Sequence, residues 1–527
     1  PEHEREVEKL IRQKAPGLVI SLSSEVQPEF REYERLSTTV LNAYLQPVMK
    51  VYLKTLEDGV RETLPNANIG INQSNGGLMS PERARQFPVR TALSGPAAGA
   101  VGASFIAQQV GRKNIITLDM GGTSADVAMI QDFKVSISFD RDVAGFPVRQ
   151  PSVDVETVGA GGGSIAWFDR DDLLKVGPAS AGAHPGPACY GLGGASPTVT
   201  DANLILGRLS PRGLLDGSMQ LYPDAAVNVF KPIAERLGFQ PEHTAHGVLG
   251  IVVANMVRTI RTISVERGYD PRQCVLMPFG GAGPLHARDV AINLGISEMI
   301  IPAAPGIVCA QGLLVSDLKE DFVVSRRLAL TDEALPVLQK VIRDLETAAS
   351  DWFTRENITP DARNLKLSID ARYTGQNFEL SVPLAEGKKI EVSKLNQTQL
   401  IHKKFCEVHE LAYGYASAAD PAEIINIRLT AIAKLFEFSS KNSANNTPSP
   451  PKADGERPVF FENPDKPTIA MCFNRASLVP GQEIHGPAII EQLDTTTPVY
   501  PGDIAKVSAD GHLIISISSG GGKKNGQ

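Results

Sequence analysis

A glycine turn between two acidic residues is the sharpest chemical signal in the sequence. The segment LDMGGTSADVAMI begins at Leu118 and has the pattern of a strand, a turn and a second strand. The adjacent Gly121 and Gly122 let the backbone approach a phosphate and turn its N–H groups toward it, while Thr123 and Ser124 add hydroxyl donors. The pattern predicts a phosphate-binding turn, and the alternative is an ordinary hairpin that needs glycine only to turn.

Two carboxylates bracket this turn. Asp119 and Asp126 stand where they could hold Mg²⁺ (or Mn²⁺), or a water that bridges to the metal, beside a bound phosphate. The sequence contains neither a GxxxxGK[ST] loop nor a GxGxxG fingerprint, which argues against a Walker-type or a dinucleotide-binding site. We therefore take Asp119 and Asp126 as the candidate catalytic and metal-binding residues of a different kind of phosphate site.

A second glycine-rich element follows a strand and opens a helix. In PFGGAGPLH, Gly280, Gly281, Ala282 and Gly283 come after the predicted strand Val275–Phe279. The strand–DxGGT–strand element resembles the phosphate hairpin of the actin and sugar-kinase superfamily, and a strand–GGxG–helix element lies against the adenosine there. This resemblance implies that these four residues line the adenosine side of an ATP site.

A third glycine run, Gly161, Gly162 and Gly163, is followed by Ser164. One interpretation places this loop at the transferring phosphate or at the substrate. The other is a tight bend near a domain junction, for which glycine is needed only conformationally. The residues alone leave both interpretations open.

The elements that must position these turns alternate between strands and helices. Asn114–Met120, Val275–Phe279 and Met299–Pro302 are apolar and have the length of buried strands. Pro241–Arg267 carries apolar residues at helical spacing, and small residues at helical spacing in SGPAAGAVGASFIA, which begins at Ser94, indicate a closely packed helix. The fold class predicted from this order is α/β.

The predicted domain organisation has five parts. They are an actin-like α/β core at 1–320, an α+β domain at 321–438, a Ser/Asn/Pro-rich linker at 439–456, a β-rich module at 457–517 and a disordered tail at 518–527. Within the second part, Thr331–Asn357 is predicted to be helical and Leu365–Leu384 to form paired strands.

Composition narrows the class of protein. Apolar residues make up 42% of the 527 residues, which is ordinary for a globular protein. The net charge of −7 argues against nucleic acid as a partner. The five cysteines form no CxxC pair, so a zinc ribbon is excluded and a reducing cytoplasm is expected. The charged N-terminal segment lacks the apolar core of a signal peptide, and the apolar stretch Gly247–Val257 is too short to span a bilayer. We expect no membrane association.

Several long segments together resemble one family, the A (ATP-binding) subunit of the hydantoinase/5-oxoprolinase family. That family also includes subunits of acetone and acetophenone carboxylases and of caprolactamase. The resemblance runs through nearly the whole chain and includes QSNGG at Gln73–Gly77, SGPAAGAVGA at Ser94–Ala103, DMGGTSADV at Asp119–Val127, VGAGGGSIAW at Val158–Trp167, PTVTDANLILGRL at Pro197–Leu209 and GPAIIEQLDTTTPVYPGD near the C-terminus.

The resemblance implies an ATP-dependent enzyme. In such an enzyme ATP phosphorylates the carbonyl oxygen of a hydantoin, 5-oxoproline or lactam, and water opens the activated ring, typically in a B-type partner subunit of a hetero-oligomer. A second possibility is the ATP-using subunit of an acetone/acetophenone-type carboxylase. The family pattern also has an earlier lobe with another phosphate hairpin, which this sequence lacks. A third possibility is therefore a non-catalytic assembly subunit.

Other residues that could do chemistry have simpler structural interpretations. Cys189 is expected to be a small packed side chain rather than a nucleophile, and His286 to pack or cap rather than to contact phosphate. Asp201 is expected to be the N-cap of a helix at Ala202–Leu209 rather than a base.

Overall fold

A computed structural model describes residues 1–215, 217–395, 397–435 and 449–518. The chain forms two compact units, each built from segments that are distant in sequence. Unit 1 comprises Pro1–Ala98, Ile137–Val153 and the described part of Leu313–Phe438. Unit 2 comprises Gly99–Ser136, Asp154–Gly312 and the described part of Ser439–Gln527.

These units do not follow the predicted domain boundaries. Residues 1–98 group with 313–438 because Leu78 pairs with Leu318 in one sheet. The C-terminal strands join the other unit because Leu513–Ser516 pairs with Glu298–Ile301. Most of the predicted linker and nearly all of the predicted tail lie outside the described residues.

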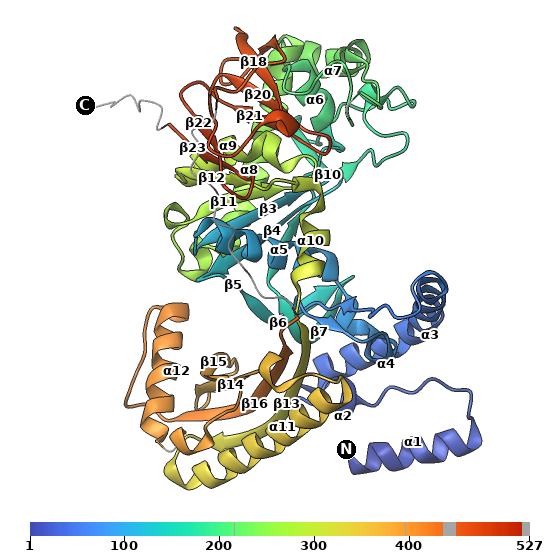
Figure 1. Cartoon of the computed structure of the whole chain (residues 1–527), viewed down its shortest axis with the longest axis vertical. Helices are drawn as coiled ribbons and strands as arrows, with labels where there is room; N and C mark the ends of the chain where they lie inside the picture. Colours follow the sequence, from blue (N-terminus) through green and yellow to red (C-terminus); the bar gives the residue numbers. More distant parts are fainter. Residues whose placement is uncertain (216, 396, 436–448, 519–527) are drawn as a thin grey trace. The chain divides into compact units, whose positions relative to one another are not determined.

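The central sheet of unit 2 has nine strands and holds the predicted phosphate hairpin (Figure 1). The predicted strands form here: β3, β11 and β12 are mutually parallel, and β4 returns antiparallel beside β3. The strand order is β19 (Glu483–His485), β22 (Ile504–Val507), β23 (Leu513–Ser516), β12 (Glu298–Ile301), β11 (Val275–Phe279), β3 (Ile115–Met120), β4 (Ala125–Gln131) and β5 (Lys134–Val135), with β8 (Val155–Val158) also paired to β4.

Helices cover both faces of this sheet, and the alternation of side chains along β3 shows how. Ile116, Leu118 and Met120 belong to one core cluster, with residues of α8 (Pro241–Ile263) and α9 (Gly283–Leu294). Ile115 faces the other way, into a cluster with α5 (Ser94–Val110) and the start of α10 (Val308–Val315). The small residues predicted to let α5 cross closely do so: a Cβ on Gly102 would lie 2.5 Å from the Val308 carbonyl oxygen.

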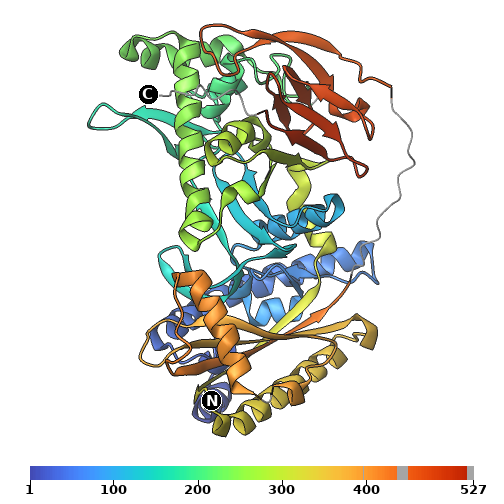
Figure 2. The same cartoon turned by 90° about the vertical axis from the view of Figure 1, so that its left-hand side faces the viewer.

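Helix α8 is longer than the apolar stretch singled out in the sequence. By length and composition alone, Pro241–Arg267 could cross a membrane, and half of its most apolar window is buried. In unit 2 it is a core helix: Val248, Val252, Met256 and Ile260 are fully buried in the main cluster. Figure 2 shows α8 running beside the strands of this unit.

The remaining elements of unit 2 flank this sheet. The C-terminal strands are divided, because β19, β22 and β23 extend the central sheet while four others form a sheet of their own, so the predicted β-rich module is not a separate body. The elements of unit 2 outside the central sheet are β9 (Ser164–Phe168) paired with β10 (Leu174–Ser180), the four-stranded sheet of β17 (Gly455–Val459), β18 (Thr468–Asn474), β20 (Ala488–Glu491) and β21 (Thr496–Val499), and, among the helices, α6 (Val199–Ile205) and α7 (Pro223–Leu237).

Unit 1 is built on a six-stranded sheet with two helices on one face. Helices α11 (Leu335–Arg355) and α12 (Thr398–Tyr413) each bury an apolar stripe against the strands. Figure 2 shows both helices beside the strands of this sheet. The helix and the paired strands predicted in this part of the sequence are confirmed. The strand order is β1 (Ile71–Asn72), β2 (Leu78–Met79), β13 (Leu318–Ala329), β16 (Ala422–Ala433), β14 (Arg363–Tyr373) and β15 (Leu380–Gly387).

The other face of the unit 1 sheet buries charge. Along β16, Ile427 and Leu429 enter the apolar core, whereas the intervening Arg428 binds Glu29 (Nη2–Oε1, 2.6 Å). Glu29 also accepts from Arg149 of β7 (Phe146–Val153), with 2.6 Å between Nε and Oε2. Because a buried charge is tolerated only when it is paired, these groups form a network rather than isolated contacts.

Helix α3 (Glu32–Thr63) presents an apolar stripe to solvent. Its inner face packs through buried residues such as Asn42 and Leu53. The outer face exposes large apolar side chains at helical spacing, each more than half exposed: Tyr33, Leu36, Val40, Tyr44, Val48 and Val51. The other elements of this region are α1 (Glu2–Lys14), α2 (Ser23–Val26), α4 (Pro81–Gln86) and β6 (Ile137–Val143), which pairs with β7.

Candidate nucleotide site in unit 2

The predicted phosphate turn is a tight hairpin between β3 and β4. Asp119 pairs with Asp126 across the two strands, and the Gly121 N–H donates to the Ser124 carbonyl (3.1 Å) to close the turn. Among the described residues, the N–H groups of Gly122 and Thr123 have no hydrogen-bond acceptor, and both residues are exposed. The tip therefore presents free backbone donors, which is the arrangement that binds an anion.

The fold itself does not require glycine at the tip. In the part of the chain that the structure describes, a Cβ added at Gly121 or Gly122 would meet nothing within 4 Å, and neither residue has the positive φ that favours glycine. The alternative interpretation, a hairpin that needs glycine only to turn, therefore has no support in the backbone. The exposed side of the tip therefore has no side chain, so a bound group can approach the backbone closely.

The other two glycine segments lie against this tip. Gly162 and Gly163 donate their N–H groups to the carbonyl oxygens of Gly121 (3.0 Å) and Gly122 (2.6 Å). A Cβ on Gly161 would lie 2.5 Å from the Thr123 nitrogen, so the loop packs directly on the turn. The structure thus gives this run a packing role and brings it to the hairpin; its predicted contact with phosphate or substrate stays a prediction.

The segment after β11 closes on the base of the hairpin. Gly280 has φ +75°, and a Cβ there would lie 2.6 Å from both the Asp119 Oδ1 and the Met120 carbonyl oxygen. The Ala282 N–H donates to that same carbonyl (3.0 Å), and Gly283 starts α9 against the Leu118 carbonyl. All three predicted glycine segments therefore meet at one place in unit 2.

The two carboxylates of the site differ in their surroundings. Burial raises the pKa of Asp119 above its usual range, and the charge of Asp126 raises it further, although the Cys309 thiol donates to Oδ2 (3.4 Å) and lowers it. Asp126 accepts from the Thr157 hydroxyl, with 2.5 Å between Oγ1 and Oδ1. A cation near the pair would relieve the repulsion between the two carboxylates.

This donor set fits Mg²⁺ rather than a metal held entirely by protein. The described residues contain no cluster of three or more His, Cys, Asp or Glu side chains that could hold a metal ion. Magnesium keeps several waters and uses one or two carboxylates together with substrate phosphates, so Asp119 and Asp126 would suffice beside a nucleotide.

Sequence reasoning missed three residues at the site. Burial, followed by the charge of Asp119, raises the pKa of the Cys309 thiol to about 12, so Cys309 is a neutral donor to that carboxylate. Thr495 donates to the Gly281 carbonyl (3.0 Å), and Asp494 accepts from the Gly306 N–H (2.6 Å). The only available signal for the last two was their polar turn in QLDTTT, some 370 residues after the hairpin.

Cys189, His286 and Asp201 are all buried in unit 2. Cys189 is fully buried, and burial raises its pKa, so it is the packed side chain that was expected. His286 is also buried, and burial followed by the charge of Arg208 lowers its pKa to about 3. The N-cap prediction for Asp201 is wrong: Thr198 is the N-cap of α6, and Asp201 is the third helical residue of a capping box.

A bare glycine hairpin with two carboxylates, set in a sheet covered by helices on both faces, defines an α/β protein with a candidate nucleotide-phosphate site. Residues 35–322 match the hydantoinase/oxoprolinase family, and residues 329–519 match the hydantoinase/oxoprolinase C-terminal domain. The chain belongs to the hydantoinase/oxoprolinase family, as the sequence segments predicted.

Relatives in this family include subunits of larger enzymes. Caprolactamase subunit alpha of Pseudomonas jessenii is 35% identical, and the match covers 99% of this chain and 75% of the relative. Acetophenone carboxylase gamma subunit of Aromatoleum aromaticum is 31% identical over 98% of this chain and 72% of the relative. The crystal structure of ATP-dependent caprolactamase from Pseudomonas jessenii superposes with a TM-score of 0.86, covering 98% of this chain and 75% of that chain.

Proposed function

We propose that this chain is the ATP-using A subunit of a cyclic-amide hydrolase, which phosphorylates the carbonyl oxygen of a hydantoin, 5-oxoproline or lactam. The observation that carries the proposal is the hairpin tip: Gly121 and Gly122 are bare where neither packing nor φ requires glycine. Similarity to caprolactamase subunit alpha supports the cyclic-amide class. ATP supplies the phosphoryl group that turns an unreactive amide carbonyl into an electrophile.

The chain's own groups would position and neutralise that phosphoryl group. The N–H groups of Gly122 and Thr123 would bind phosphate oxygens, and Asp119 and Asp126 would hold Mg²⁺ or Mn²⁺, whose charge would neutralise the phosphates. Gly280–Gly283 line the adenosine side. The proposal includes an actin-like fold for unit 2, which the strand–hairpin–strand–helix order of this unit supports.

A carboxylase subunit is the second candidate. Similarity to acetophenone carboxylase gamma subunit favours it, and phosphorylation of a ketone oxygen would use the same groups of this chain. The two candidates are separated by the substrate that accelerates phosphate release from ATP: a lactam or hydantoin for the hydrolase, a ketone with bicarbonate for the carboxylase.

The test of the proposal is calorimetric titration with Mg-ATP. This chain spans 75% of the length of caprolactamase subunit alpha. The titration therefore compares two proteins, the chain alone and a version extended to the full length of that relative. We expect saturable binding that an Asp119→Ala variant loses. Binding by neither form, or equal binding by the variant, would overturn the nucleotide site and favour an assembly subunit.

We further propose a B-type partner subunit and a cytoplasmic location. The exposed apolar stripe on α3, from Tyr33 to Val51, supports a protein partner, because large exposed apolar surfaces mark interaction sites. Co-purification with a B-type subunit should be lost in a Tyr44→Glu variant and kept in a Lys54→Glu variant of the same helix. Assembly that survives Tyr44→Glu would move the interface elsewhere.

A further inference from the structure

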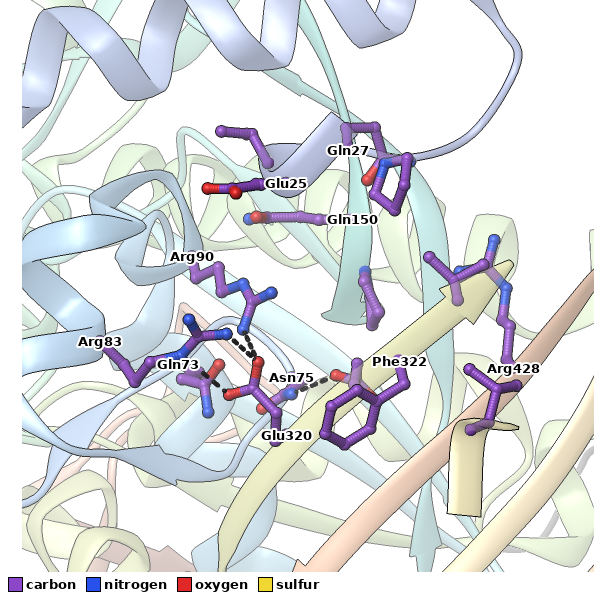
Figure 3. Close-up of a pocket in the computed structure, with 16 residues that line it drawn as sticks. Glu25, Gln27, Gln73, Asn75, Arg83, Arg90, Gln150, Glu320, Phe322 and Arg428 are labelled. Atoms are coloured by element: carbon purple, nitrogen blue, oxygen red, sulfur yellow. Dashed lines mark hydrogen bonds and ion pairs between the residues drawn. The ribbon is translucent and has the colours of Figure 1, made fainter. Parts of the chain in front are cut away.

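Unit 1 contains a cavity that the proposed nucleotide chemistry does not use. Its volume is about 220 Å³, and residues of α2 and the segment after it, of β7 and of β13 contribute to its lining (Figure 3). This volume is below the ~300–1,000 Å³ of a drug-sized site. The cavity therefore suits a molecule much smaller than a nucleotide.

The charged side chains of the lining balance one another. They are three carboxylates and three guanidinium groups, namely Glu25, Glu320, Asp321, Arg83, Arg90 and Arg428. Although burial raises the pKa of Glu320, the charges of Arg90 and Arg83 lower it below its usual range, so this carboxylate is ionised beside the two arginines. A ligand with a net charge of either sign would meet like charges in this lining, which is unfavourable. The cavity therefore favours a ligand whose net charge is zero.

Most of these charged groups are already engaged within the protein. Arg83 and Arg90 converge on Glu320, as Figure 3 shows, with 3.0 Å between Arg90 Nη1 and Glu320 Oε1. Both oxygens of Asp321 accept from neutral donors, at 2.6 and 2.7 Å. The third arginine of the lining belongs to the buried network around Glu29. A ligand can recruit only the groups that remain.

Two groups of opposite charge remain. Among the described residues, the exposed Glu25 carboxylate has no hydrogen-bond donor, and Arg90 makes one side-chain hydrogen bond, through Nη1. Arg90 Nε and Nη2 therefore have no acceptor, yet neither is buried away from water. Because Glu320 and the Phe87 ring, 4.8 Å from Arg90 Cζ, hold the guanidinium in place, its free N–H groups are oriented before a ligand arrives.

We propose that this cavity binds a small zwitterionic amino acid, whose carboxylate accepts from Arg90 and whose ammonium group donates to Glu25. Hydrogen bonds between charged groups are about twice as strong as neutral ones, and a guanidinium can hold a carboxylate through two parallel N–H bonds. The carbon chain of the ligand contacts the apolar part of the lining, which includes Phe322 and Leu345. This site goes beyond the proposed function and does not depend on it.

The test is a titration without nucleotide, followed by ligand-observed NMR. Glycine, β-alanine and 4-aminobutyrate carry the two charges at increasing separation, and at least one of them should bind saturably. For that amino acid, the matching acid without the amine and the matching amine without the carboxylate should each bind about tenfold more weakly. Each of these single-charge analogues brings an uncompensated charge to a lining whose charges balance.

Glu25→Gln is the decisive variant. Glu25 has no side-chain partner in the described part of the chain, so the unfolding temperature should not change. Binding of the amino acid should weaken about fivefold, the upper range for a solvent-exposed ion pair, whereas binding of the matching acid should not weaken. The preference for the amino acid over the acid should therefore largely disappear. Glu32→Gln, at an exposed position of α3 outside the lining, is the matched control and should bind as the wild type does.

Arg90→Gln tests the other end of the ligand. Arg83 still pairs with Glu320 in this variant, so that carboxylate keeps a partner. Affinity for the amino acid should fall about tenfold, since the ligand carboxylate loses its charged donor. Arg326→Gln, at an exposed position of β13 outside the lining, should leave the affinity unchanged. If Arg90→Gln does not fold, the preference measured in Glu25→Gln decides alone.

Three results would overturn the site. They are no binding by any of the three amino acids, equally tight binding of an acid or an amine that lacks the other charge, and an unchanged preference in Glu25→Gln. Because no ATP is present, each of these results leaves the nucleotide site as it is. Failure of Mg-ATP to bind unit 2 would equally leave this cavity and its ligand in place.

Discussion

The glycine site of unit 2 and the buried ion-pair network of unit 1 satisfy charge in opposite ways. The hairpin is open and offers backbone N–H groups, with side chains removed by Gly121 and Gly122. The network is made of buried side chains, and Glu29 is shared by Arg149 and Arg428. Its arginines are already neutralised by buried carboxylates.

The comparison shows what an exposed and a buried charge each require of the protein. A phosphate carries a large negative charge. Several backbone N–H groups and a metal ion can bind it together only if no side chain covers the backbone. A charge buried among side chains needs a partner of opposite sign at contact distance, because water cannot solvate it there. Four substitutions break or sharpen this contrast.

Removing Glu29 should have the largest effect. Glu29→Leu leaves Arg149 and Arg428 buried without that partner, and we expect unit 1 to lose about 3–5 kcal/mol of stability. Although burial alone raises the Glu29 pKa, Arg428 and Arg149 lower it below its usual range. Glu29 therefore contributes stability that is lost as pH falls from about 4.5 toward its lower folded-state pKa, and the variant should lose less stability than the wild type over that pH range. Denaturant melts at several pH values measure both.

Gly161→Ala should damage unit 2 through packing. Its methyl group would meet the Gly122 and Thr123 backbone, and overpacking of this kind costs about 1–3 kcal/mol. Thermal unfolding measures the loss, and Gly247→Ala in α8 is the control, since a Cβ there meets nothing. A Gly161→Ala protein as stable as the control would show that the loop does not press on the hairpin.

Gly122→Val should do the opposite, keeping stability and losing the ligand. No atom of the described residues lies within 4 Å of a Cβ at this position, whereas a phosphate on the tip would collide with the new side chain. We expect Mg-ATP binding to weaken at least tenfold, or about 1.4 kcal/mol, with an unfolding temperature close to that of the wild type. Gly247→Val should bind normally. Unchanged binding by Gly122→Val would remove the tip from the site.

Asp119→Asn should have the smallest effect, and a stabilising one. Burial raises the Asp119 pKa, so the folded state keeps its proton to higher pH than the unfolded state, and stability falls as pH rises from the ordinary value of 3.8 through the raised one. At pH 7 the variant should unfold a few degrees higher than the wild type, since ~1 kcal/mol is about 2–4 °C in a domain of this size.

The same variant tests the metal without measuring activity. The stability gain of Asp119→Asn should disappear near pH 3, where wild-type Asp119 is protonated in both states. Added Mg²⁺ should raise the unfolding temperature of the wild type more than that of the variant, because only the wild type has two carboxylates to share the cation. A gain that is constant with pH would contradict the electrostatic explanation.

Much of the glycine site could be predicted because its signals are local. The period of apolar residues predicts β3, β11 and α8, and the turn residues DMGGTSAD mark the hairpin between two strands. The contacts with Thr495 and Cys309 could not be predicted, because they depend on how distant segments pack. The boundaries of the two units could not be predicted for the same reason, because they follow the pairing of β2 with β13 and of β12 with β23.

By itself, the sequence determined the α/β class, the three glycine segments and the family, since these depend on residue type, short-range spacing and the order of long segments. The tertiary structure decided which glycines are free and which are packed, because that depends on neighbours distant in sequence: Gly122 faces open space, while Gly161 presses on Thr123. It alone also revealed the ion-pair network of unit 1, where Glu29, Arg149 and Arg428 are ordinary charged residues until folding buries them together.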